Sequence, residues 1–193
     1  MTSRSALVLL LVGTGCEDGA LRAFETEDAS VAGLLDDFED ADIRAGTDGW
    51  WYATDDGTGP PAVMSFPALD ERGASSHAAR LEAGPTLDYG AFLGLDLPGG
   101  VYDASAFDRL TFAARANPPF TLSVTFLDTI FEHYEATLEV GEAWQEVAIP
   151  LSSFQKDGAA LDPARITHLQ FWAKGPGPAF ELWVDDVRFT TAD

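Results

Sequence analysis

The sequence predicts an all-β protein with the fold of an antiparallel β-sandwich. Short segments alternate apolar and polar residues, as half-buried strands do. Breaks rich in glycine and proline separate these segments, at 56–61, 98–100, 117–119 and 175–178. No long segment with helical periodicity survives between the breaks. Short alternating strands joined by Gly/Pro turns are typical of an antiparallel sandwich or barrel.

The expected strands follow one another along most of the chain. The first, GLLDDFED at 33–40, alternates so that Leu34 and Phe38 would face inward. In ITHLQFWAK (166–174), Leu169 and Phe171 would face the core. Four further strands are expected at 109–116, 120–128, 144–151 and 180–189.

The last expected strand, FELWVDDVRF, changes phase along its length. Its apolar set is Phe180, Leu182 and Val184, followed by Val187 and Phe189. The slip falls at the two aspartates between Val184 and Val187, and a β-bulge would produce it.

Composition narrows the possible function classes. The chain has 193 residues, enough for one domain with a proper core, and 46% of them are hydrophobic. Its net charge of -21 argues against a nucleic-acid partner and against binding to an anionic membrane surface. No nucleophile, phosphate-loop or metalloprotease motif is present, and the three histidines lack a metal-ligand spacing. We therefore expect a protein that is not an enzyme.

The N-terminus is expected to direct export. Residues 1–16 combine Arg4, a short apolar run and a cysteine, which favours a signal peptide over a membrane span. Their end resembles a bacterial lipoprotein signal, which implies lipidation of Cys16; an ordinary secretory signal is the alternative. Residues 17–33 are acidic and weakly patterned and are interpreted as a tether, followed by the domain at 34–193.

Three segments carry a resemblance to a known family. VYDASAFDRLTFAARA, WQEVAIPLSSF and FELWVDDVRF resemble jelly-roll carbohydrate-binding modules of the galactose-binding-domain-like class, such as family-eleven cellulose-binding modules. LLDDFED followed by GWWYATDDGTG resembles their N-terminal portion. The resemblance covers 34–193 and implies a jelly roll. Because one fold hosts many functions, its implication for the ligand is weaker.

The resemblance also implies a structural Ca²⁺ where the first and last strands meet. Calcium takes six to eight oxygen ligands, mostly carboxylates and carbonyls. The implied ligands are Glu39 and Asp185, with Asp37 and Asp186 as further candidates. The alternative is an acidic edge that discourages strand addition.

The second implied site is a sugar platform, which needs flat aromatic rings beside fixed polar groups. One candidate is the cluster of Trp50, Trp51 and Tyr52, with Trp51 and Tyr52 as the expected binding residues. The other is a strand face on which Arg115, Thr125, Gln170 and Trp172 would lie together, all pointing away from the core. The alternative for each tryptophan is a place in the core, which is favoured for Trp144.

These features predict a lipid-anchored, non-catalytic protein of the bacterial cell envelope, on the periplasmic or surface side of the outer membrane. Its expected partner is a polysaccharide or other glycan, with the membrane reached through Cys16, and a monomer is expected. The alternative is a structural or protein-interaction module of the envelope that shares the fold and lacks a sugar site.

Overall fold

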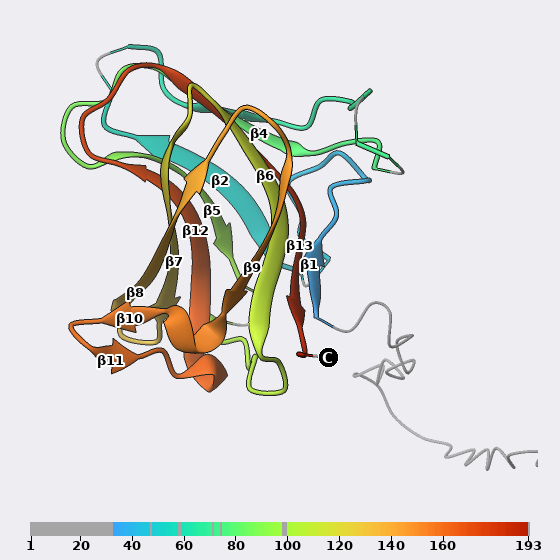
Figure 1. Ribbon diagram of the computed structural model, residues 1–193, viewed down its shortest axis with the longest axis vertical. Helices are drawn as coiled ribbons and strands as arrows, with labels where there is room; N and C mark the ends of the chain where they lie inside the picture. Colours follow the sequence, from blue (N-terminus) through green and yellow to red (C-terminus); the bar gives the residue numbers. More distant parts are fainter. Residues whose placement is uncertain are drawn as a thin grey trace, which may run out of the picture.

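The computed structural model describes residues 33–46, 48–57, 59–70, 72–73, 75–97 and 100–192, and these form two antiparallel sheets packed face to face (Figure 1). The predicted all-β sandwich is confirmed. The predicted signal peptide, Cys16 and nearly all of the tether lie outside the described residues. Within the described part of the chain, no helix is long and apolar enough to cross a membrane.

The first sheet has six strands. Its order is β3-β4-β13-β6-β9, and β1 pairs with β13 beside this path. The strands are β1 (Leu34–Asp36), β3 (Val63–Ser65), β4 (Ala79–Ala83), β6 (Arg109–Asn117), β9 (Gln145–Pro150) and β13 (Phe180–Thr190).

The second sheet has seven strands in the order β11-β10-β8-β7-β12-β5-β2. They are β2 (Trp50–Asp55), β5 (Gly90–Asp96), β7 (Phe120–Asp128), β8 (His133–Val140), β10 (Gln155–Lys156), β11 (Ala159–Ala160) and β12 (Ile166–Lys174). Two short 3-10 turns, η2 (Leu151–Ser153) and η3 (Pro163–Arg165), flank β10 and β11.

Apart from the first, which is limited to β1, the strands predicted from alternation are present with nearly the predicted bounds. Residues 120–128 and 166–174 form β7 and β12, and Leu169 and Phe171 are fully buried as expected. The core between the sheets is rich in aromatic rings. Phe126 packs 4.7 Å from Phe154, measured between ring centroids, and Trp51 stacks on Phe171 at 6.3 Å. Each such side chain contributes about 1.5–3 kcal/mol on burial.

The two ends of the domain meet, and β1 lies beside β13 (Figure 1). The predicted phase slip is present as a register shift between Asp185 and Arg188, with Asp186 at a φ of 51°. The expected inward position of Leu34 is wrong: Leu35 is fully buried and Leu34 is not. Phe38 is buried as expected, but it reaches the core from a left-handed backbone with a φ of 57°, because strand β1 has already ended at Asp36.

Candidate functional site

The outer face of the seven-stranded sheet brings polar and aromatic side chains into register. Residues directly opposite each other on antiparallel strands point to the same face. Tyr52 pairs with Gly94, Gly94 with Gln170, and Gln170 with Thr125, so these four lie in one row across β2, β5, β12 and β7.

A cluster of aromatic rings occupies this face. Phe92 lies between Tyr52 and Trp172, with ring centroids 5.9 Å and 5.3 Å away. Tyr89 contacts Trp172 edge-on, and its carbonyl accepts a 2.8 Å hydrogen bond from the indole Nε1–H. We call Tyr52, Tyr89, Phe92 and Trp172 the platform. Its rings are held by neighbouring strands and by one another, so they form a rigid apolar surface.

Gln170 forms a polar floor beside the platform. Its side chain is only 5% exposed, and its Oε1 has no hydrogen-bond partner among the described residues. Gln170 hydrogen-bonds the hydroxyl of Tyr52, and burial raises the pKa of that phenol. A buried amide oxygen without a partner is costly, and such groups mark places where water or a ligand supplies the missing donor.

Gly94 lets Tyr52 lie across the sheet. A Cβ built at Gly94 would lie 2.7 Å from the Tyr52 hydroxyl oxygen and closer still to the ring. Only glycine therefore allows the phenol to cross β5 and reach Gln170. The position of the ring depends on this one residue of the neighbouring strand.

Charged groups border the platform. The Lys174 ammonium lies 4.7 Å from the centroid of the Trp172 ring and forms an ion pair with Glu135. His133 lies 6.2 Å from Trp172, and burial together with the Lys174 charge lowers the pKa of the imidazole. A neutral imidazole offers one donor and one acceptor, which suits hydroxyl groups.

The prediction that Trp51 belongs to a sugar platform is wrong. Trp51 is 2% exposed and packs between the sheets, 5.1 Å from Phe38. Its indole N–H donates a 2.7 Å hydrogen bond to Oδ2 of Asp36, which is itself buried. Tyr52, the next residue, points to the opposite side because side chains alternate along a strand.

The prediction that Arg115 shares a face with Gln170 and Trp172 is also wrong. Arg115 lies on β6, in the six-stranded sheet, and points away from the core on the opposite side of the sandwich. Its guanidinium lies 4.6 Å from the ring centroid of Trp183 and 5.2 Å from that of Trp144. These cation–π contacts occupy both indoles, so Trp144 lies at the surface of the sheet and not in the core.

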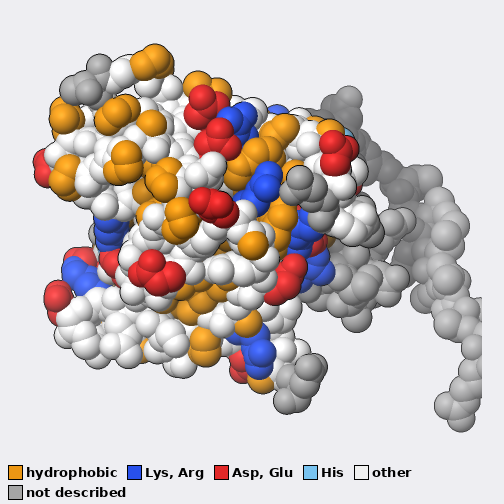
Figure 2. Space-filling model, turned by 45° about the horizontal axis from the view of Figure 1, so that its top comes forward, with side chains coloured by type: hydrophobic (Ala, Val, Ile, Leu, Met, Phe, Trp, Pro, Cys, Tyr) orange, Lys and Arg blue, Asp and Glu red, His pale blue; other side chains and the backbone are white. Residues whose placement is uncertain are grey.

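Other arginines extend the same contacts. Arg80 lies 5.4 Å from Trp183, and Arg72 lies 5.3 Å from Trp144. Figure 2 shows one side of the molecule, on which basic side chains lie beside hydrophobic and acidic ones. We interpret the arginine and tryptophan side chains on the outer face of the six-stranded sheet as a structural cover.

Thr125 lies on the platform side but is fully buried, where its hydroxyl is 3.2 Å from that of Ser123. It therefore supports the face from below. Phe92, Gly94 and Tyr89 were not predicted as site residues. The sequence did hold a signal for Phe92. The apolar residues Ala91, Leu93 and Leu95 recur at every second position, which puts Phe92 on the opposite face of the strand.

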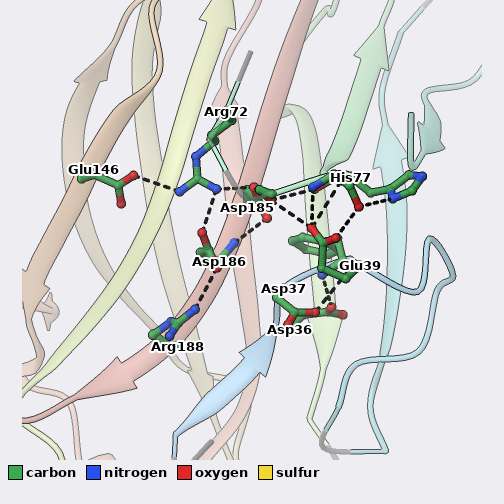
Figure 3. A network of polar contacts seen from close by, with 12 residues as sticks. Asp36, Asp37, Glu39, Arg72, His77, Glu146, Asp185, Asp186 and Arg188 are labelled. Atoms are coloured by element: carbon green, nitrogen blue, oxygen red, sulfur yellow. Dashed lines mark hydrogen bonds and ion pairs between the residues drawn. The ribbon is translucent and has the colours of Figure 1, made fainter. Parts of the chain in front are cut away.

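The carboxylates at the chain ends surround an arginine. Figure 3 shows Arg72 directed at Asp185 and Asp186, with Glu146 on its other side. Arg72 Nη1 contacts Oδ2 of both aspartates, at 2.8 Å for Asp186. Asp185 is fully buried, and this burial raises the pKa of its carboxyl group against the opposing effects of Ser75 and Arg72.

Glu39 is bound by a separate set of donors. Its carboxylate accepts hydrogen bonds from the hydroxyls of Ser75 and Ser76 and from the Ser76 backbone N–H. Together these donors, led by the Ser76 hydroxyl, lower the pKa of Glu39 to about 2. The Ser75 hydroxyl oxygen also lies 2.7 Å from Oδ2 of Asp185, so its one proton is within reach of a carboxylate from each chain end.

This arrangement does not fit the predicted calcium site. Arg72 already supplies positive charge to Asp185 and Asp186, and serine donors satisfy Glu39. Among the described residues, no three or more His, Cys, Asp or Glu side chains are grouped to hold a metal ion. Asp37 contributes only a local turn, in which its Oδ1 accepts a hydrogen bond from the Glu39 N–H. Calcium at this junction stays a prediction without support from the geometry.

Comparisons with known proteins agree with this architecture. Residues 102–191, slightly less than half of the chain, match the family model "Carbohydrate binding domain 30". A search of curated proteins found no match. The family 11 carbohydrate-binding module from Clostridium thermocellum, solved with a β-1,3-1,4-mixed-linked tetrasaccharide, superposes with a TM-score of 0.55 at 20% identity, covering 83% of this chain and 95% of that one.

Two further structures are similar. A family 30 module of a cellulosomal cellulase of Clostridium thermocellum has a TM-score of 0.53 at 19% identity, covering 75% of this chain and 92% of that one. An exo-β-agarase has a TM-score of 0.65 at 12% identity, covering 84% of this chain and 26% of that one. The fold is that of family 11 and family 30 carbohydrate-binding modules. The identities are low, so the structural likeness concerns the fold, and the ligand has to be argued from the site.

Proposed function

We propose that the domain is a non-catalytic module that binds a neutral polysaccharide on the outer face of the seven-stranded sheet. The observation that carries the proposal is the buried Gln170, whose Oε1 lacks a partner in the described structure, next to the platform rings. Sugars present apolar C–H faces and hydroxyl groups. A ring stacked on the platform can place a hydroxyl where Gln170 needs a donor.

The charges favour a neutral glycan over an anionic one. The protein carries a net charge of -21, and Lys174, which lies over the Trp172 ring, is paired with Glu135. A uronate or sulfate chain would meet a repulsive field, and the ammonium group beside the Trp172 ring is already paired. The mixed-linked glucan of the similar Clostridium thermocellum module is uncharged, which makes such glucans the first candidates.

The proposal places the module in the bacterial envelope. Attachment to the bacterial envelope through Cys16 rests on the sequence of residues 1–16 alone, which lie outside the described structure. In this setting the module would hold polysaccharide near the cell surface. The fold similarity and residues 102–191 support glycan binding and say nothing about the anchor.

Affinity electrophoresis tests the ligand. The wild type is run through native gels that contain mixed-linkage β-glucan, xylan or galactan. We expect retardation in at least one gel, and we expect Trp172→Ala to abolish it because the largest ring of the platform is removed. Trp183→Ala, on the opposite sheet, is the matched control and should migrate like the wild type. A wild type that is retarded by none of the three would contradict the proposal, as would full retardation of Trp172→Ala.

A further inference from the structure

A pocket lies beyond the platform at one end of the same face. Its volume is about 490 Å³. It is formed where β2 begins, β5 ends and β12 begins, and the turn between β7 and β8 adds one wall. The lining side chains used below are Trp50, Asp96, Val101, Phe131 and His168.

The floor of the pocket is a further row of cross-strand pairs on β2, β5 and β12, the strands that carry the platform. Trp50 pairs with Asp96, and Asp96 pairs with His168, so all three point outward with Tyr52, Gln170 and Trp172. His168 Nε2 lies 2.7 Å from Asp96 Oδ1, and both side chains remain partly accessible. The pair therefore offers polar groups whose positions are already fixed.

Exposed apolar side chains form the walls. Trp50 is 54% exposed, Phe131 is 64% exposed and Val101 is 48% exposed. The Phe131 ring lies 5.7 Å from the His168 ring, at an angle of 48°. Large aromatic side chains left in solvent around a polar pair are the arrangement expected of a sugar-binding position.

The backbone holds Phe131 in this exposed place. Phe131 has a φ of 62°, a left-handed conformation that a bulky residue rarely adopts. The buried carboxylate of Asp128 stabilises the turn by accepting hydrogen bonds from the N–H groups of Ile130 and Glu132, at 2.9 Å and 3.0 Å. Strained residues of this kind persist where the surroundings fix them, and they cluster at binding sites.

We propose that this pocket is a second sugar-binding position, which takes a further unit of the glycan chain bound on the platform. His168 and Trp172 are four residues apart on β12, which corresponds to about 13 Å along the strand. This separation exceeds one sugar ring. The glycan would therefore run along β5 and β12, and the protein would recognise an oligosaccharide in preference to a single sugar or a disaccharide. The inference rests on the proposed function.

Calorimetric titration with mixed-linked β-1,3-1,4-glucan oligosaccharides of increasing length tests this inference. The wild type should bind the hexasaccharide more tightly than the disaccharide. Trp50→Ala and Phe131→Ala should each weaken hexasaccharide binding about five- to tenfold and leave the affinity for short oligosaccharides unchanged. Ile130→Ala is the matched control, because Ile130 is 68% exposed in the same turn and does not line the pocket.

The outcomes separate the two proposals. Wild-type hexasaccharide affinity in both Trp50→Ala and Phe131→Ala would overturn the second position, while loss of binding in Trp172→Ala would still support the platform. Equal affinity of the wild type for all lengths would also overturn it. If the wild type bound neither the oligosaccharides nor any polysaccharide gel, the proposed function itself would fail. Circular dichroism of each variant confirms that it is folded.

Discussion

Asp36 makes the stability of this domain sensitive to pH in an unusual direction. Its Oδ1 accepts a 2.7 Å hydrogen bond from the Phe38 N–H, and its Oδ2 accepts one from the Trp51 indole. The residue is 5% exposed, and desolvation outweighs these two donors, so the pKa of its carboxyl group rises from 3.8 to about 7. Folding therefore favours the protonated form of Asp36.

The sign and size of the effect follow from linkage. Below pH 3.8 the carboxyl group is protonated in both the folded and the unfolded states. Between pH 3.8 and about 7 the unfolded state ionises first, so the contribution of Asp36 to stability is lost as the pH rises. The loss is about 1.4 kcal/mol per pH unit, on the order of 4 kcal/mol in total.

Asp36→Asn removes this titration. Urea unfolding is followed by tryptophan fluorescence from pH 4.5 to 8. The asparagine cannot satisfy both N–H donors, so the variant should be less stable than the wild type at pH 4.5, by about 1–3 kcal/mol. As the pH rises, the wild type should lose stability relative to the variant. Asp157→Asn, at an exposed turn, is the control and should follow the wild type at every pH. A difference between Asp36→Asn and the wild type that stays constant across the range would refute the reasoning.

Three further predictions concern the platform and the chain ends. Gly94→Ala should displace Tyr52 and weaken polysaccharide binding at least about tenfold in affinity gels, whereas Gly59→Ala, with open space around its Cβ, should bind normally. Arg72→Ala should lower the free energy of unfolding by about 3–5 kcal/mol in urea because Asp185 stays buried without its cation; EDTA should leave the melting temperature of the wild type unchanged, and a clear drop would restore the calcium prediction. Glu39 contributes stability above pH 4.5 that is lost as the pH falls toward about 2, so acid unfolding of Glu39→Gln should begin at higher pH than that of the wild type.

Much of the fold could be predicted from the sequence because its determinants are local. Alternation defined β7 and β12 to the residue, and the change of phase before Val187 correctly located the bulge in β13. Both are properties of a single strand, in which successive side chains point to opposite sides. The same rule placed Arg115 and Gln170 on the outward sides of their strands, which is correct for each residue taken alone.

The candidate site could be predicted only in part, because a sandwich has two outward faces. Alternation says that Arg115 points away from the core, but only the strand order shows that β6 and β12 belong to different sheets. Alternation also cannot say which of the adjacent residues Trp50 and Trp51 faces the core. One of the two adjacent rings has to be buried, and the choice was made by the packing of Trp51 on Phe38 and Phe171.

The sequence by itself determined the all-β class and the main strands, since these depend on residue patterns within short segments. The meeting of the two chain ends was implied by the family resemblance and is present in the pairing of β1 with β13. The tertiary structure alone decided what lies at that meeting point. Arg72 stands more than a hundred residues before Asp185 along the chain, in a segment without a strand pattern, and it supplies the positive charge for which calcium was predicted. The platform likewise exists because three separate strands bring Tyr52, Phe92 and Trp172 together. The alternation within one strand cannot predict contacts between residues so far apart in the sequence.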